Sequence, residues 1–196
     1  MIQIHTLTLG LYQTNCYIVH KEGSKTCIVI DPGYDANTIL NRAALLGLEI
    51  EAILLTHGHF DHVGAVRQIA ADTDCRVFLH ENELTLPAAM TNGPLYYTDL
   101  YGTEGTAHIA GLDVKVLHTP GHTPGSVCLL MADAMFSGDT LFAGSMGRCD
   151  FPGSNLFDMR KSLRKLRELP GDYRVFPGHA EDTTLEHERK TNPYLR

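Results

Sequence analysis

The residues best suited to chemistry lie together at positions 56–62, which read Thr-His-Gly-His-Phe-Asp-His. Four of these side chains can bind a metal: His57, His59, Asp61 and His62. Imidazole and carboxylate groups suit zinc, iron and similar metals. The segment directly follows the apolar run Ala52–Leu55, and a loop at the end of a strand can hold several ligands around one ion. The spacing therefore predicts a metal site.

Three further candidate ligands lie where a predicted strand runs out into a glycine-containing turn. His122 follows the run Val114–Leu117, Asp139 lies in Phe-Ser-Gly-Asp-Thr, and His179 lies in Val-Phe-Pro-Gly-His. In layered α/β proteins such strand ends converge on one edge and build the site. Together with the first segment they make five histidines and two aspartates, enough for two metals if one carboxylate bridges them.

The elements that must position these side chains come in two similar groups. Period-two and continuous apolar runs predict strands at Ile2–Thr8, Cys16–His20, Cys27–Ile30, Ile50–Leu55, Arg76–Leu79, Thr106–Ile109, Leu112–Leu117, Ser126–Met131, Ala134–Phe136 and Tyr173–Phe176. Capping residues and apolar stripes predict helices after Asp35, from His62 to about Ala71, after Ser154 or Asn155, and near Thr184–Thr191. Strands followed by helices, twice over, predict a four-layer α/β arrangement built on two sheets.

Composition excludes several classes of function. The chain has 196 residues, which favours one domain, and a formal net charge of −7, which argues against a nucleic-acid partner. No window approaches a membrane span and the first residues do not resemble a signal peptide, so we expect a cytoplasmic protein. Five scattered cysteines without a CxxC pair favour reduced thiols. The sequence leaves the oligomeric state open.

Two other stretches have alternative interpretations. Residues 87–105 form the longest irregular stretch, and their tyrosines Tyr96, Tyr97 and Tyr101 either line a substrate pocket or pack on the domain. The helix predicted after Asn155 carries five basic side chains on one face. That face is either solvated or recruits an anion.

The motifs THGHFDH, GHTPGS, FSGDTLF and FPGH, in this order, resemble those of the metallo-β-lactamase superfamily across nearly the whole chain. The resemblance implies a single αββα domain over residues 1–196. It also implies that His57, His59 and His122 hold one metal, that Asp61, His62 and His179 hold the second, and that Asp139 and a hydroxide bridge them. Zinc is the first expectation, and iron and manganese also suit these ligands.

Within the superfamily the chain is most similar to short bacterial glyoxalase II-like proteins, on the segments Thr-Asn-Cys-Tyr at 14–17, Gly-Arg-Cys-Asp-Phe at 147–151 and the tail from His187 to Tyr194. This likeness implies hydrolysis of a thioester by the bridging hydroxide, with Asp61 able to accept a proton. It makes Arg148 the first candidate for a substrate-carboxylate contact, unless Arg148 only pairs with Asp150. Full-length glyoxalase II continues into a helical glutathione-binding domain, which we do not expect here, and this leaves the thioester open.

Two other enzyme readings share these motifs. The persulfide dioxygenases resemble the chain as well, and that likeness implies one iron held by His57, His122 and Asp139. A dinuclear esterase or lactonase would use the same seven ligands on a different substrate. A binding protein that uses the metals only as a scaffold is the remaining, non-catalytic alternative.

Overall fold

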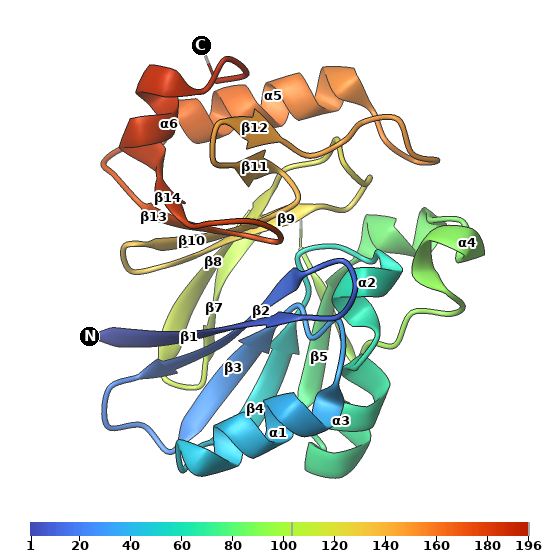
Figure 1. Ribbon diagram of the computed structural model, residues 1–196, viewed down its shortest axis with the longest axis vertical. Coiled ribbons are helices and arrows are strands. Elements are labelled where there is room, and N and C mark those ends of the chain that lie inside the picture. The colour runs from blue at the N-terminus through green and yellow to red at the C-terminus, as the bar shows by residue number, and fades with distance from the viewer. Residues whose placement is uncertain (103, 196) are drawn as a thin grey trace.

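The computed structural model describes residues 1–102 and 104–195. Its first sheet has the strand order β1-β2-β3-β4-β5-β6, antiparallel up to β3 and parallel from β3 onward. Its strands are β1 (Ile2–Leu9), β2 (Thr14–Lys21), β3 (Thr26–Ile30), β4 (Glu49–Leu54), β5 (Arg76–His80) and β6 (Asp99–Tyr101). Helices α1 (Ala36–Leu45) and α3 (Val66–Thr73) cover its outer face (Figure 1).

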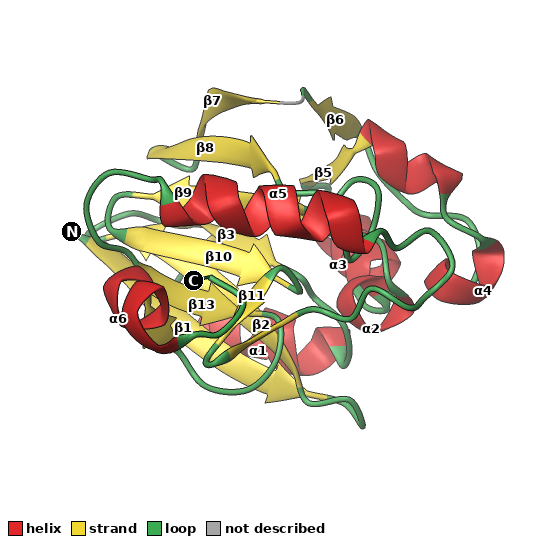
Figure 2. Ribbon diagram, turned by 90° about the horizontal axis from the view of Figure 1, so that it is seen from above, coloured by secondary structure: helices red, strands yellow, loops and turns green. Residues whose placement is uncertain are grey.

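The second sheet has the order β14-β13-β10-β9-β8-β7, with β10 and β13 parallel and the other neighbours antiparallel. Its strands are β7 (Glu104–Ile109), β8 (Leu112–His118), β9 (Val127–Met131), β10 (Ala134–Gly138), β13 (Arg174–Pro177) and β14 (Thr183–Thr184). Helices α5 (Leu156–Arg167) and α6 (Leu185–Thr191) lie on its outer side, and Figure 2 shows α5 crossing above its strands.

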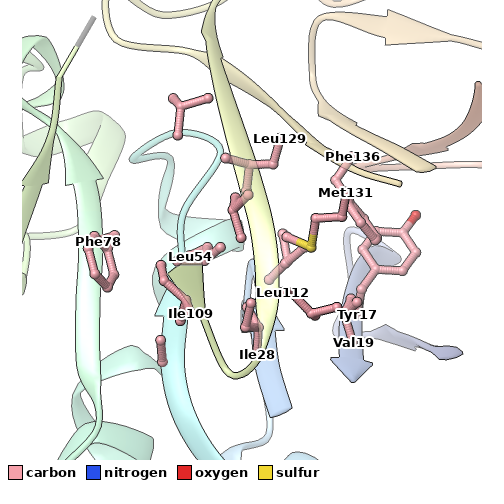
Figure 3. Close-up of a cluster of buried hydrophobic side chains, with 14 of the residues drawn as sticks. Tyr17, Val19, Ile28, Leu54, Phe78, Ile109, Leu112, Leu129, Met131 and Phe136 are labelled. Atoms are coloured by element: carbon pink, nitrogen blue, oxygen red, sulfur yellow. The ribbon is translucent and has the colours of Figure 1, made fainter. Parts of the chain in front are cut away.

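Apolar side chains fill the three spaces between these four layers. The middle space holds residues of both sheets, among them Tyr17, Leu54, Leu129 and Phe136, which Figure 3 shows between the strands. Burial of this kind, at roughly 25 cal/mol per Å² of apolar surface, is the main force that holds layered folds together. The four-layer αββα fold predicted from the sequence is confirmed.

Most predicted elements are present with shifted ends, and the capping predictions explain two helix starts. Asp35 accepts a hydrogen bond from the backbone of Thr38, and Asn155 accepts from Phe157 and Asp158. The structure adds short elements that carry little periodicity: the helices η1 (Glu81–Thr85) and α4 (Ala88–Thr91), and a hairpin of β11 (Leu141–Phe142) and β12 (Ser145–Met146). No helix in the described residues is long and apolar enough to cross a membrane.

The helix predicted from His62 to Ala71 is wrong, because the chain forms two helices there. Helix α2 spans Phe60–Val63 and α3 begins at Val66. Between them Gly64 passes so close to the backbone of Gly33 that a Cβ would lie 2.3 Å from the Gly33 carbonyl oxygen. The break gives the ligand-bearing helix α2 its own direction, independent of the helix that packs on the sheet.

Candidate metal centre

Loops at one edge of the two sheets bring the seven candidate ligands together. His57 and His59 follow β4, Asp61 and His62 lie on α2, and the other three follow β8, β10 and β13. Two sets of three among these seven residues have their ligand atoms within 4.8 Å of one another, and a third such set joins Asp31 to His57 and His62. We call His57, His59 and His122 the histidine trio, and Asp61, His62 and His179 the mixed trio.

Asp139 lies between the two trios. Its Oδ2 is 3.4 Å from Nε2 of His122 in the histidine trio and 3.6 Å from Nε2 of His179 in the mixed trio, and its Oδ1 is 3.5 Å from Nε2 of His62. The Oδ1 atom is buried and has no hydrogen-bond partner. A carboxylate so placed can serve both trios, because its Oδ2 alone lies near a histidine of each.

The contacts among the inward-facing nitrogens are those of a cation site. Nδ1 of His59 and Nε2 of His122 are 2.9 Å apart, and Nε2 of His62 and Nε2 of His179 are 3.3 Å apart. Nε2 of His57 is buried without a partner. Because buried polar atoms are normally satisfied, such a cluster of unpaired imidazole nitrogens and carboxylate oxygens fits divalent metal ions.

Outer hydrogen bonds set the tautomers of three of the histidines. Nδ1 of His62 donates to Asp31, Nδ1 of His122 to the carbonyl of Arg148, and Nδ1 of His179 to the carbonyl of Tyr12. With the proton on Nδ1, Nε2 of each ring keeps its lone pair and points into the centre. Partners of this kind orient metal-binding imidazoles and raise their basicity.

Asp31 supports both trios, and the sequence analysis missed it. Its Oδ2 accepts the proton of Thr56 Oγ1 at 2.6 Å and that of His62 Nδ1 at 2.9 Å. Because the Thr56 hydroxyl donates to Asp31, its oxygen is free to accept from Nδ1 of His57, 3.0 Å away. Asp31 stands directly after β3 and next to Pro32-Gly33, the same signal that identified the ligands.

Glu83 joins the two loops of the histidine trio and was also missed. This fully buried carboxylate accepts from the backbone of Gly58 at 2.5 Å and of Gly125 at 2.6 Å. Gly58 lies between His57 and His59, and Gly125 follows His122 by three residues. Burial raises the pKa of Glu83 despite these hydrogen bonds. Glu83 occurs in an acidic, helix-like stretch, and nothing in its spacing indicates this contact.

The Thr-Asn-Cys-Tyr segment of β2 fixes the turn that carries His179. The amide of Asn15 donates to the carbonyls of Pro177 and Ala180, and the hydroxyl of Tyr17 donates to Pro177. Within the turn Gly178 is essential, because a Cβ there would lie 2.3 Å from Oδ1 of Asp139. One motif of the first sheet thus positions a ligand carried by the second.

The tail motif at 187–194 supports the hairpin β11–β12. The buried carboxylate of Glu188 accepts from the backbone of Gly144, and the amide of Asn192 donates to the carbonyls of Phe142 and Ser145. Phe142, Ser145 and Met146 of this hairpin line the cavity beside the candidate ligands. The tail therefore shapes a wall of the cavity without touching the metal ligands.

The protonation preferences of the two trios differ. Burial, and then the neighbouring imidazoles, lower the pKa of His57 well below its usual range and that of His59 to about 3. Burial also acts to lower the pKa of His62, but Asp139 and Asp31 outweigh it and raise the value to about 9. Burial acts to raise the pKa of Asp61, yet the His179 and His62 rings hold it well below its ordinary value. The carboxylates around the mixed trio therefore make a bound proton or metal cation more favourable there than at the histidine trio.

A cavity of about 670 Å³ opens over the two trios. Its walls are largely apolar and come from several elements: Tyr12, Phe60, Met90, Phe142, Met146 and Phe151. A polar reacting centre with apolar walls is the usual design of a small-molecule site. Met90 comes from helix α4 of the 87–105 stretch, so that stretch does contribute to the wall.

The tyrosines of that stretch do not line this cavity. Tyr101 is 7% exposed and stacks on Phe78 in the core between the sheets, which contradicts its prediction as a pocket residue. Tyr96 packs beneath the guanidinium of Arg67, and Tyr97 lies on a separate surface pocket. The β6 pairing turns Tyr101 inward, and a strand of three residues leaves too little pattern to show this in the sequence.

Arg148 lies at the edge of the cavity, where a substrate could reach it. Its side chain also pairs with Asp150, as the alternative interpretation of this residue predicts. Its guanidinium donates two hydrogen bonds to Asp150, at 2.9 and 2.8 Å, and lies over the ring of Phe151. The side chain remains 65% exposed. Its backbone carbonyl meanwhile holds His122, so the segment has a structural task whatever the side chain binds.

Comparison with known proteins agrees with this geometry. The profile of the Metallo-beta-lactamase superfamily matches residues 9–179. The hydroxyacylglutathione hydrolase GloC of Haemophilus influenzae is 32% identical over 99% of this chain and 98% of its own length. Among solved structures, TTHA1623 in a di-iron-bound form is 38% identical with a TM-score of 0.85, covering 97% of this chain and all of the other. ETHE1 from Myxococcus xanthus is 28% identical, with a TM-score of 0.82 over 97% of this chain and 83% of its own.

Proposed function

The chain belongs to the metallo-β-lactamase superfamily, and from this premise we propose that it is a thioesterase of the glyoxalase II type, which hydrolyses S-acyl-glutathione or a similar thioester. The observation that supports this most is the pair of complete ligand trios meeting at Asp139 beneath an apolar cavity. Similarity to a hydroxyacylglutathione hydrolase over nearly the full length of both chains supports the substrate class.

Two divalent metals fit the site, with the histidine trio holding one, the mixed trio the other and Asp139 shared. Zinc is the first candidate. Iron is the second, because a similar protein, TTHA1623, has been solved in a di-iron-bound form. Manganese also suits these nitrogen and oxygen ligands. Metals held by these residues would lower the pKa of a bound water toward neutrality and would polarise an acyl oxygen. This chemistry requires no additional strong base from the protein.

The protein's own residues orient the reactants and exclude bulk water. The outer hydrogen bonds that Asp31, Glu83 and the Tyr12 carbonyl accept fix the ligand geometry before substrate arrives, which lowers the cost of reorganisation. Phe142 and Phe151 supply apolar surface for the acyl or thiol chain. Oδ2 of Asp61 lies 3.3 Å from Nε2 of His179 and is placed to accept, transiently, a proton released during attack on the acyl carbon. Its lowered pKa makes it a weak base that would pass the proton on.

Arg148 is the proposed contact for a substrate carboxylate. Its planar guanidinium suits bidentate binding of a carboxylate, and its exposed position at the cavity edge lets a ligand replace Asp150. Replacing Arg148 by Ala should raise KM for S-lactoylglutathione while kcat stays near the native value. Equal losses in KM and kcat would instead indicate that Arg148 only shapes the loop around His122.

The deciding experiment measures metal content and hydrolysis on the same purified protein. We expect two metal equivalents per chain and release of glutathione from S-lactoylglutathione. A panel of other thioesters, simple esters and lactones then separates the thioesterase from an esterase or lactonase. Two bound metals with no turnover on any of these substrates would exclude the proposal and favour a scaffold role.

A persulfide dioxygenase is the second candidate, because the chain is similar to ETHE1. That reading uses one iron on His57, His122 and Asp139, and the 3.4 Å approach of His122 to Asp139 permits it. The complete mixed trio has no part in it, which is why we rank it second. One iron per chain with oxygen uptake on glutathione persulfide would favour it over the hydrolase.

We also propose that the protein works in the cytoplasm on a small-molecule substrate. All five cysteines are unpaired, and four of them are buried, as expected in a reducing compartment. A free-thiol count on freshly isolated protein should give five. The count is made after unfolding in denaturant without reductant, because four of the thiols are buried; a lower count there would argue for an oxidising compartment.

A further inference from the structure

A second surface hollow lies behind the cavity wall, on the outer side of the second sheet. This groove of about 470 Å³ runs between helix α5 and the segment Pro193–Leu195, and Figure 1 shows the C-terminus beside α5. Three arginines line it, Arg160, Arg164 and Arg167. We call it the arginine groove. It contains three of the five basic side chains of α5, the helix face that the sequence predicts to be either solvated or anion-binding.

The three guanidinium groups lack carboxylate partners within the described residues. Three other arginines do have carboxylate partners: Arg76 pairs with Asp99, Arg148 with Asp150 and Arg174 with Asp133. The chain as a whole carries a net charge of −7, so three uncompensated positive charges on one groove run against its average. Charges of one sign gathered in a concave surface create a potential that attracts the opposite charge.

The spacing of the arginines fits an extended anion. Positions 160, 164 and 167 follow the i, i+4, i+7 pattern of one helix face, and seven residues of helix rise about 10 Å. Guanidinium forks match phosphate oxygens in pairs. Apolar side chains, Leu156 and Leu163 among them, line the same groove and suit an uncharged part of the ligand.

The groove adjoins the metal cavity across the hairpin β11–β12. Met146 of this hairpin lines both hollows. The start of α5 is fixed beside the histidine trio, because the backbone of Asn155 donates to Gly121 and a Cβ on Gly121 would lie 2.4 Å from Cα of Met159. The arginines therefore begin near the cavity and lead away from it.

We propose that the arginine groove binds the phosphate-bearing part of a coenzyme A-type thioester, whose acyl end reaches over Met146 to the metal cavity. The substrate assignment rests on the proposed thioesterase function, whereas the groove itself does not. In the reaction the oxygen of water bonds to the acyl carbon and the carbon–sulfur bond breaks. The products are the carboxylate, the free thiol of the carrier and one proton.

The binding test uses adenosine 3′,5′-bisphosphate, which carries phosphates but no thiol that could reach a metal. Titration calorimetry on the metal-loaded protein should show binding, and Arg164→Glu should weaken it at least about tenfold, as expected for loss of a charge-assisted contact. Lys161→Glu is the matched control: it makes the same charge change on α5, at an exposed residue outside the groove. Equal weakening by both variants, or no binding to the native protein, would overturn the proposal.

The kinetic test compares S-acetyl-coenzyme A with S-acetyl-pantetheine, which lacks the phosphates. Arg164→Glu should raise KM about tenfold for the first substrate only, with kcat unchanged. If the bisphosphate binds but neither thioester is hydrolysed, the groove stands and the thioesterase proposal fails. If S-lactoylglutathione is hydrolysed but the bisphosphate does not bind, the thioesterase proposal stands and the groove proposal fails. Dimerisation that Arg164→Glu abolishes would show that a second copy occupies the groove, against the proposal.

Discussion

The histidine trio and the mixed trio differ in burial, in charge and in how they are held. The side chains of the histidine trio are at most 4% exposed, whereas His179 of the mixed trio is 26% exposed. The mixed trio contains the carboxylate of Asp61, while the histidine trio must rely on Asp139 for negative charge. Glu83 fastens the loops of the first, and Asn15 fastens the turn of the second. The histidine trio is therefore enclosed. The mixed trio reaches solvent at His179 and supplies a negative charge of its own to a bound cation.

The largest expected effect comes from the residue that the two trios share. Asp139→Ala should lower kcat/KM on the order of 10³-fold, because it removes the carboxylate whose Oδ2 lies 3.4 Å from His122 of the histidine trio and 3.6 Å from His179 of the mixed trio. Metal content, measured by mass spectrometry of the folded protein, should fall below two equivalents. A variant that keeps both metals and full activity would show that the trios do not depend on Asp139.

Two outer-contact variants should separate the trios. Glu83→Gln replaces one accepting oxygen with an amide NH₂ facing a backbone N–H, so it should weaken metal binding at the histidine trio about 10–100-fold. Asn15→Ala should have an effect of similar size on the mixed trio alone. Cobalt titration followed by absorption spectroscopy distinguishes the two sites.

Thermal unfolding of the same two variants without metal provides the control. If both unfold at similar temperatures and lose different sites, the two trios are held independently. If both variants lose the same site, the comparison between enclosed and open halves is wrong.

Chelator should remove the metal of the mixed trio before that of the histidine trio. The reason is access: His179 is partly exposed, whereas all three rings of the histidine trio are buried. Dialysis against rising chelator concentrations should pass through a one-metal form, and activity should fall with the first equivalent lost. Simultaneous loss of both equivalents would mean that Asp139 couples the trios too tightly for stepwise release.

The smallest expected effect is the loss of folding stability at acid pH that comes from His80, which lies just before the segment that carries Glu83. Burial, and then the stacked ring of His118, lower the pKa of His80 to about 4, and His80 accepts a hydrogen bond from Asn82 at the start of η1. A histidine with a lowered folded-state pKa stabilises the fold fully above its unfolded pKa of about 6.5, and this contribution is lost as pH falls toward 4.

His80→Phe keeps an aromatic ring against His118 but cannot be protonated. Its free energy of unfolding, from urea titrations between pH 7 and pH 4.5, should fall less steeply with acid than that of the native protein. Parallel slopes for the two proteins would mean that His80 does not sense pH in this range.

The sequence identified the seven candidate ligands that the structure brings together, but not all of the residues that hold them. Each of the seven candidates stands at a strand end beside a turn, and that rule depends only on local order along the chain. Glu83 acts through backbone partners 25 and 42 residues away, so no local pattern reveals it. Asp31 does stand at a strand end beside a Pro-Gly turn, but its partners, Thr56 and His62, are 25 and 31 residues away in sequence. The same reason explains Tyr101, whose inward direction is set by pairing with β5.

The helix break at Gly64 shows another limit. The apolar stripe of Val66, Ile69 and Ala70 is real and packs on the first sheet. The hydrophobic period cannot show that the preceding turn is displaced, because the cause is the nearby backbone of Gly33. Periodicity thus identifies a helix face but not where a distant loop interrupts it.

Each trio takes ligands from both halves of the sandwich. His57, His59, Asp61 and His62 precede the middle of the chain, and His122, Asp139 and His179 follow it. Metals bound at the two trios would therefore cross-link the halves, much as disulfides do in chains whose cysteines are oxidised. Loss of metal would then release one sheet edge from the other and open the molecule to proteases at its catalytic end. Availability of metal in the cell would govern the lifetime of the protein as well as its activity.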